Sequence, residues 1–207
     1  MVKYKNIKAN EDEEVIGVIR KPSQVLMRSL QSVEYTVYFH GPIGSPDEYL
    51  EHFAVYQGAN SNDLIRLYIN SNGGNLATAL EYIRHMRHCA APIIGVIGLN
   101  CASGASAVAL SCDAWEIDDF STCLVHGFSY GAEGNAFAVS NQVAFNSALN
   151  ERWVRKTYED FLTEEEIKDA LRGVDILIDS ESLDERLAHL VEIRDKIEEE
   201  QDECIEQ

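Results

Sequence analysis

Ser103 stands at a point in the sequence where a serine could act as a nucleophile. The apolar run PIIGVIGL at 92–99 precedes it, and Gly104 and further small residues follow it. A sharp turn from a strand to a helix exposes a serine Oγ while the N–H of the next residue faces the same point, as in the nucleophile elbow of hydrolases, although the GxSxG pattern is absent here. The same position suits an ordinary helix N-cap, and taken alone the N-cap is the better interpretation.

A serine hydroxyl attacks poorly at neutral pH unless a base takes its proton and a third group orients that base. Of the 6 histidines, His126 ends the apolar run TCLV and precedes a glycine, which places it at the end of a predicted strand. We interpret His126 as the best candidate base, with a buried structural histidine as the alternative. Spacing alone leaves the orienting acid open among Asp113, Asp118, Asp119 and Asp175.

A second turn that could belong to the same site follows the apolar run LIRLYI at 64–69. It contains Gly73 and Gly74 in the sequence NSNGGN. Two glycines let the backbone approach a bound group closely and point an N–H at it. An NGG sequence is also a common connection between a strand and a helix, so a functional role here depends on a partner site.

Strand-like and helix-like segments alternate along the chain, and they must position these turns. Apolar runs typical of strands occur at 14–20, 34–40, 64–69, 92–99, 114–117 and 122–126, and helical patterns occur at 22–32, 76–89 and 103–112, with a further helix opened by the capping-box residues Ser45 and Glu48. Because the strands are apolar at nearly every position, we expect an α/β fold with a largely parallel sheet covered on both faces.

The second half of the chain carries a long helical pattern. It covers about 139–161 and follows the glycine-containing segment GFSYGAEGNAFA at 127–138. A helix of this length spans about 30 Å or more, which exceeds a small domain, so we expect part of it to project toward another subunit. Thr163 and Glu166 predict a capping box for the next helix, and Gly173 predicts its end.

Length and charge restrict the class of protein. The 207 residues suit one main domain. We expect a flexible segment at 1–14, a domain at 15–192 and an acidic tail at 193–207. The formal net charge of -18 argues against a nucleic-acid partner. No targeting segment and no apolar run long enough for a membrane span is evident, so we expect a cytoplasmic protein without a membrane partner.

The cysteines give no sign of a metal site or a disulfide framework. They are odd in number, scattered and without a CxxC pair: Cys89, Cys101, Cys112, Cys123 and Cys204. We interpret them as reduced thiols of a cytosolic protein, and we expect neither a metal nor a cofactor.

Five motifs occur in order along the chain: FHGPI at 39–43, LYINSNGG at 67–74, GLNCASGA at 98–105, LVH at 124–126, and Asp175 followed by ILIDSES. Through these motifs the chain resembles, over about residues 15–190, the proteolytic subunit of Clp protease (ClpP, peptidase family S14) within the ClpP/crotonase superfamily. The resemblance implies a spiral of β-β-α units with a protruding handle helix. It also implies a serine endopeptidase that cleaves unfolded polypeptides.

The resemblance assigns a role to each candidate residue. It implies that Ser103 is the nucleophile, that His126 is the general base and later the acid, and that Asp175 holds the imidazole. The N–H groups of Gly73 and Gly104 then form the oxyanion hole. The order Ser, His, Asp differs from the orders in chymotrypsin, subtilisin and the α/β-hydrolases.

The resemblance also implies how substrates and partners bind. The segment after His126 resembles an edge strand that pairs with an extended peptide, so Gly74, Leu76 and Phe128 become the expected substrate-binding residues. The long helix resembles the handle through which two rings stack. The implied assembly is a homo-oligomeric ring, either a heptamer or a double-ring tetradecamer, fed by an AAA+ unfoldase of the ClpX or ClpA type. The chain itself contains no GxxxxGK motif for ATP.

Several alternatives stay open. Gly104 stands where the family usually has Met, which also resembles signal-peptide-peptidase relatives, and a viral prohead maturation protease would share the same site. A crotonase-type acyl-CoA enzyme would share the fold and the oxyanion hole without needing Ser103 and His126. A catalytically silent ring subunit would keep the handle alone. Within the site, Ser106 is the fallback nucleophile.

Overall fold

The computed structural model describes residues 32–205. Its elements, in chain order, are β1 (Glu34–His40), a 3-10 helix η1 (Pro46–Tyr49), α1 (Leu50–Gly58), β2 (Leu64–Ser71), α2 (Leu76–Arg87), β3 (Ile93–Ala102), α3 (Gly104–Leu110), β4 (Ala114–Ile117), β5 (Thr122–Val125), α4 (Ala136–Tyr158), α5 (Glu164–Leu171), β6 (Ile176–Asp179) and α6 (Ser180–Ile205). The expected flexible segment at 1–14, the strand at 14–20 and, apart from Ser32, the helix at 22–32 lie outside the described residues.

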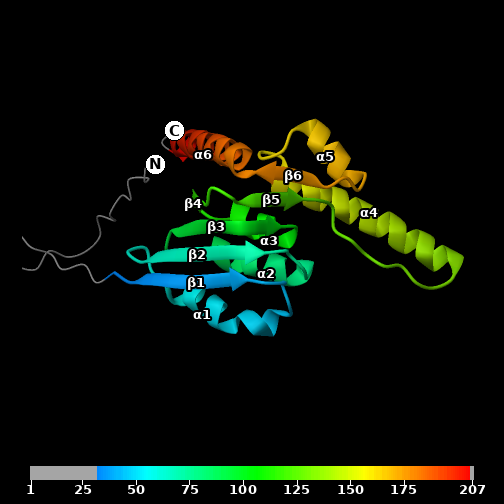
Figure 1. The fold of residues 1–207 in the computed structure, drawn as a ribbon, viewed down its shortest axis with the longest axis horizontal. Helices are drawn as coiled ribbons and strands as arrows, with labels where there is room; N and C mark the ends of the chain where they lie inside the picture. Colours follow the sequence, from blue (N-terminus) through cyan, green and yellow to red (C-terminus); the bar gives the residue numbers. More distant parts are fainter. Residues whose placement is uncertain (1–31, 206–207) are drawn as a thin grey trace, which may run out of the picture.

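The strands form one sheet of six in the order β1-β2-β3-β5-β6, with β4 paired to β3. All pairs are parallel except β5 with β6, which is antiparallel. Figure 1 shows the sheet with helices α1, α2 and α3 on one side of it, and α4 extending well beyond it. The α/β fold with a protruding long helix, expected for a ClpP-like chain, is therefore confirmed.

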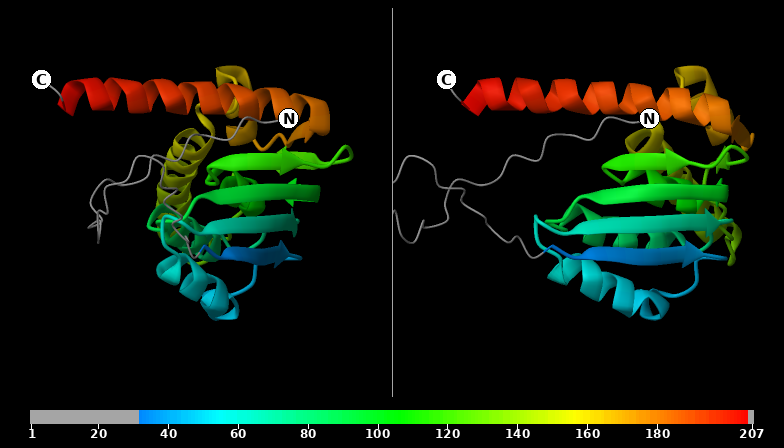
Figure 2. Two further views of the ribbon diagram at one scale, coloured as in Figure 1. Left: turned by 90° about the vertical axis from the view of Figure 1, so that its left-hand side faces the viewer. Right: turned by 60° about the vertical axis from the view of Figure 1, so that its left-hand side comes forward.

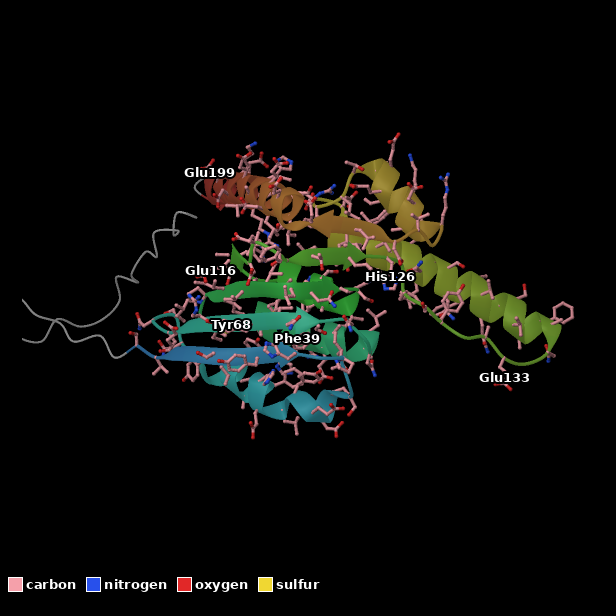
Figure 3. The ribbon with its side chains drawn as sticks, in the orientation of Figure 1. Phe39, Tyr68, Glu116, His126, Glu133 and Glu199 are labelled. Carbon is pink, nitrogen blue, oxygen red and sulfur yellow. The ribbon has the colours of Figure 1, made fainter. Side chains whose placement is uncertain are left out.

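The core lies between the sheet and these helices. In β1, Val37 and Phe39 are buried, while Tyr38 and His40 point the other way and are exposed, Tyr38 to 59%. Figure 3 shows Tyr68 of β2 on the same uncovered face, where its ring contacts Tyr38 at 5.3 Å between centroids. Among residues 32–205, therefore, the expectation of a sheet covered on both faces is wrong for β1 and β2. These strands alternate with a period of two, so their tyrosines face outward although their apolar character suits a core.

Capping residues set the ends of the helices much as expected. Glu166 Oε2 accepts a hydrogen bond from Thr163 N at 2.8 Å, and Thr163 Oγ1 accepts one from Glu166 N at 3.3 Å. Gly173 follows α5 with a φ of 88°. This left-handed conformation suits glycine and ends the helix. Both predictions are confirmed.

Helix α4 begins three residues earlier than expected, because Asn135 is its cap. Asn135 Oδ1 accepts a hydrogen bond from Ala138 N at 3.0 Å. The helix has 23 residues, or about 35 Å at 1.5 Å per residue. Its outer part carries exposed phenylalanines, Phe137 at 84% and Phe145 at 69%.

Helix α6 is the longest helix described, with 26 residues. It runs past the sheet edge formed by β5 and β6 (Figure 2), and the expected acidic tail from residue 193 onward is the last part of this helix up to residue 205. None of the helices in the described part of the chain combines the length and the apolar character that a bilayer span requires.

Candidate active site

Ser103 lies in a strained turn between β3 and α3. Its main chain has a φ of 57° and a ψ of -127°, and it is the one non-glycine residue with a positive φ among residues 32–205. Such a conformation costs about 1–3 kcal/mol and persists only where surrounding contacts hold it. Although Ser103 occupies the N-cap position of α3, its side chain makes no capping hydrogen bond. The hydroxyl is therefore not used as a cap.

His126 faces this hydroxyl. Its Nε2 lies 2.7 Å from Ser103 Oγ, which is hydrogen-bonding distance. The parallel pairing of β3 with β5 places Ala102 opposite Leu124, so the residues just after both strands meet at the same edge of the sheet. Figure 3 shows His126 at the end of β5, where the chain turns toward α4.

Asp175 lies on the other side of the imidazole. Its Oδ1 is 3.6 Å from His126 Nδ1, which is within ion-pair range but longer than a hydrogen bond. The Asp175 side chain is 58% exposed. The residue sits in the short loop between α5 and β6, where Gly173 and Asp175 face solvent.

The other candidate aspartates are used elsewhere. Asp113 Oδ2 accepts a hydrogen bond from Ile93 N at 2.7 Å, and Asp118 Oδ1 accepts one from Phe120 N at 3.4 Å. Asp119 lies in the same turn as Asp118. The ion pair of His126, within the described part of the chain, is with Asp175.

Gly73 packs directly against the serine turn. A Cβ on Gly73 would lie 2.5 Å from Ala102 O and 2.7 Å from Ser103 Cβ. The φ of 81° at Gly73 would also strain the backbone of any residue that has a Cβ. Its N–H, however, donates to Ser71 Oγ at 3.1 Å. The expected oxyanion donor at Gly73 is therefore already engaged within the chain.

The neighbouring amides are placed differently. Gly74 forms a parallel bridge with Ile43, in which the bonds run from Ile43 N to Gly73 O and from Asn75 N to Ile43 O. Within the described part of the chain, the N–H of Gly74 makes no hydrogen bond. No hydrogen bond given for residues 32–205 uses the N–H of Gly104, at the start of α3, either.

Two of the expected substrate-binding residues, Leu76 and Phe128, come shortly after the glycine turn and after His126 along the chain. Leu76 opens α2 and is half-buried, and Phe128 is half-buried in the segment that leads to α4. Phe128 N donates to Asn150 Oδ1 at 2.8 Å. The segment from residue 127 to 135 forms no strand within this chain. Figure 1 shows it running out beside α4 to the outer end of that helix.

Sequence reasoning missed Ser71 and Asn150. Ser71 Oγ links the chain after β1 to the glycine turn, since it donates to Gly41 O at 2.5 Å and accepts from Gly73 N. Asn150 in α4 holds the chain just after His126 by accepting from Phe128 N, which lies 22 residues earlier in the sequence. Neither residue has a local sequence signal, because each acts across elements that the fold brings together.

The described residues form no metal centre at this site. Among residues 32–205 no group of three or more His, Cys, Asp or Glu side chains is arranged to hold a metal ion. A hollow of about 440 Å³ lies among α2, α3, α4 and α6, with Arg84, Trp153 and Lys156 on its walls, and none of the candidate catalytic residues lines it.

An ion pair joins α5, which precedes the loop of Asp175, to α6, which follows β6. Arg186 in α6 donates from Nη1 and Nη2 to the two carboxylate oxygens of Glu166 in α5, at 2.9 and 2.7 Å. Arg186 Nη1 also donates to Phe161 O at 3.1 Å. Chiefly through the hydrogen bonds from Arg186, the pKa of Glu166 is lowered to about 2. The folded chain therefore favours the ionised carboxylate.

Replacing Arg186 by leucine is expected to lower the free energy of unfolding by about 1–3 kcal/mol near pH 7. Because the folded pKa of Glu166 lies below its ordinary value of 4.5, this contribution is complete above that value and is lost as the pH falls toward 2. Urea unfolding near pH 7 and at about pH 3.5 measures the difference in unfolding free energy between wild type and variant. This difference should be smaller at the lower pH.

The matched control is Arg172→Leu, because Arg172 pairs with Asp169 on the surface, with side chains 73% and 47% exposed. It should change the unfolding free energy by about 0–1 kcal/mol. If the difference in unfolding free energy between wild type and Arg186→Leu were the same at both pH values, the stabilisation could not be assigned to ionised Glu166.

Comparison with known protein families identifies the Clp protease family. A model of the Clp protease family matches residues 43–188, a range that contains Gly73, Ser103, His126 and Asp175. Comparison with curated proteins gives no match.

Proposed function

Because the chain belongs to the Clp protease family, we propose that it is a serine endopeptidase that cleaves unfolded polypeptides through Ser103, His126 and Asp175. The family supports a ClpP-like peptidase, and one observation supports the serine chemistry. Ser103 is held in a strained turn with its Oγ 2.7 Å from His126 Nε2 and in no capping bond. A nucleophile and its base in contact at such a turn are the parts that acyl transfer requires.

The proposed reaction is acyl transfer in two halves. As Ser103 Oγ attacks the carbonyl carbon of the scissile peptide, its proton passes to His126 Nε2 and the carbonyl oxygen becomes an oxyanion. The C–N bond then breaks, the leaving amine takes the proton from His126, and an acyl ester stays on Ser103. Water attacks this ester while His126 accepts its proton, and the acid product leaves with Ser103 restored.

Asp175 orients His126 in this scheme. The separation of 3.6 Å between its Oδ1 and His126 Nδ1 must shorten by about 0.5 Å to make a hydrogen bond. Catalytic hydrogen bonds are often long before substrate binds and tighten in the complex. The exposed loop position of Asp175 allows such a movement.

The oxyanion needs two N–H donors, and one of them is proposed to be Gly104. The second comes from the turn at Gly73 and Gly74. Gly73, the donor expected from the sequence, would have to exchange its bond to Ser71 for one to the oxyanion, whereas Gly74 N–H needs no exchange. Donors that are already oriented cost no reorganisation during the reaction.

Substrate is proposed to bind as an extended peptide. The segment from 127 to 135 carries main-chain groups that no strand of the described chain pairs, and a peptide could add to them as a strand. Phe128 lies on this segment, and Gly74 and Leu76 are proposed to line the other side of the bound peptide. Main-chain pairing would give affinity with little demand on the substrate's sequence.

Assembly into rings is proposed from the apolar surface. Phe137 and Phe145 are exposed on α4, and Tyr38 is exposed on a face of β1 that no described helix covers. Large exposed apolar surfaces are typical of contacts between subunits. We place the protein in the cytoplasm, which agrees with the unpaired state of Cys89, Cys101, Cys112 and Cys123, and an AAA+ unfoldase is its proposed partner.

Replacing Phe145 by aspartate should reduce the native mass of the assembly, because it places a charge in the proposed contact between α4 helices. The side chain is 69% exposed in the single chain, so the fold itself should tolerate the change. Phe145→Leu, which keeps the site apolar, should retain the wild-type mass. Native mass spectrometry checks this, and equal masses for all three proteins would contradict a role of α4 in assembly.

A peptidase assay tests the proposed function as a whole. Wild type should cleave a short fluorogenic peptide and an unfolded protein, and should leave a folded protein largely intact, because a closed ring excludes it. Equal rates on the folded protein and the peptide would argue against a chamber. No cleavage of any substrate would favour the catalytically silent subunit.

A further inference from the structure

Two buried hydroxyls lie directly beneath the serine turn. Ser106 in α3 and Tyr158, the last residue of α4, are each 1% exposed. Ser106 Oγ and Tyr158 OH are 2.9 Å apart. The mechanism above uses neither residue.

Both hydroxyls reach the main-chain carbonyl of Ser103. Ser106 Oγ donates to Ser103 O at 2.6 Å, Ser106 N–H donates to the same oxygen at 3.0 Å, and Tyr158 OH lies 3.4 Å from it. Since the Ser106 proton is used on Ser103 O, the proton of Tyr158 is the one shared with Ser106 Oγ. The bonds form a chain from Tyr158 through Ser106 to Ser103. Burial raises the pKa of Tyr158 well above its ordinary value, so the phenol stays a donor.

The carbonyl of Ser103 belongs to the same planar peptide as the N–H of Gly104. In a trans peptide the C=O and the N–H point in opposite directions. Holding Ser103 O from the buried side therefore turns Gly104 N–H toward the outer side, where His126 and Ser103 Oγ meet. The ψ of -127° at Ser103 is the angle that this anchoring fixes.

We infer that Ser106 and Tyr158 are positioning residues, whose linked hydroxyls set the Ser103–Gly104 peptide plane and so aim the oxyanion donor and the nucleophile. This inference rests on the proposed peptidase function. It assigns Ser106 a role other than nucleophile, since its Oγ is buried and used on Ser103 O. It also explains how a strained turn is maintained without a capping bond from its own side chain.

The expected kinetic effect falls on kcat. The oxyanion forms only after attack, so a misaimed donor weakens the transition state with little change in substrate binding. Removing an oxyanion donor outright costs about 10²–10³ in kcat. Ser106→Ala, which only loosens the donor, should lower kcat about 10-fold or more with KM within about 2-fold.

Tyr158→Phe removes the second hydroxyl without changing the ring. It should lower kcat about 3-fold to 10-fold, because Ser106 then lacks its partner. The loss of kcat in the double variant should be about the same as in Ser106→Ala alone, since both hydroxyls act through one chain of hydrogen bonds. A purely structural role for the two residues would not produce this pattern.

Tyr56→Phe is the matched control. Tyr56 OH donates to Tyr82 OH at 3.0 Å in another buried pair of hydroxyls, which packs between α1 and α2 without a contact to Ser103 among the described bonds. It should lower Tm by an amount similar to Tyr158→Phe and leave kcat unchanged. All variants are assayed with the fluorogenic peptide at a temperature where each is fully folded by circular dichroism.

The outcomes separate the inference from the proposed function. If wild type cleaves the peptide and Ser106→Ala and Tyr158→Phe keep wild-type kcat, the inference is overturned and the peptidase stands. Additive losses in the double variant, or losses confined to KM, would overturn it as well. If wild type neither cleaves the peptide nor reacts with a fluorophosphonate, the proposed function fails and the inference fails with it.

Discussion

Replacing Ser103 by alanine is expected to lower kcat for peptide cleavage by about 10⁴-fold or more. The loss is this large because no other group of the site can form the acyl ester. The fold should be nearly unaffected, because the Ser103 hydroxyl bonds to His126 and does not cap α3. Assay of the fluorogenic peptide measures the loss, and thermal unfolding checks the fold.

A control with the same substitution lies in the cap of the same helix. Ser111 Oγ donates to Ala107 O at 3.0 Å at the end of α3, so Ser111→Ala removes a serine hydroxyl nearby without touching the site. Its kcat should match that of wild type. If Ser103→Ala kept activity within about 10-fold of wild type, Ser103 would not be the nucleophile.

Replacing Gly73 by alanine is expected to have the second largest effect. It should lower both the catalytic activity and the stability of the fold. The added Cβ would lie 2.5 Å from Ala102 O, 2.7 Å from Ser103 Cβ and 3.0 Å from Gly104 N, and these are main-chain or short side-chain atoms that cannot move aside freely. The φ of 81° adds strain for any residue with a Cβ. We expect kcat to fall by about 100-fold or more, because the serine turn must shift.

The unfolding free energy of this variant should fall by about 1–4 kcal/mol. Gly58→Ala is the control, because Gly58 ends α1 without a positive φ and a Cβ added there would meet no atom within 4 Å. It should keep wild-type activity and stability. Full activity in Gly73→Ala would show that the close packing between the two turns is not needed for catalysis.

Much of the fold could be predicted from the sequence, because the signals for strands and helix ends are local. The capping box at Thr163, the glycine at 173 and the strand-like runs from residue 34 onward each depend on neighbouring residues, and the structure has them as expected. The run at 14–20 lies outside the described residues. The uncovered face of β1 is hard to predict because tyrosine is apolar enough to suit a core and polar enough to face water. The antiparallel direction of β6 has no signature in its own four residues.

The site was predictable in part for the same reason. Ser103 and His126 stand at recognisable strand ends, and the structure brings them to 2.7 Å. The bond between Gly73 N–H and Ser71, and the contact of Tyr158 with Ser106 across 52 residues, depend on how distant elements pack. No spacing in the sequence encodes such contacts, which is why the engagement of Gly73 N–H and the buried support beneath Ser103 emerged only with the structure.

The most direct test of the central claim is reaction of the native protein with a fluorophosphonate, followed by mass mapping of the adduct. A fluorophosphonate reacts with a serine whose hydroxyl is activated by a base. We expect a single adduct on Ser103 that forms far more slowly in His126→Ala, whereas a crotonase-type acyl-CoA enzyme would give none there. An adduct on Ser106 or another serine, or no adduct at all on a folded protein, would contradict the central claim.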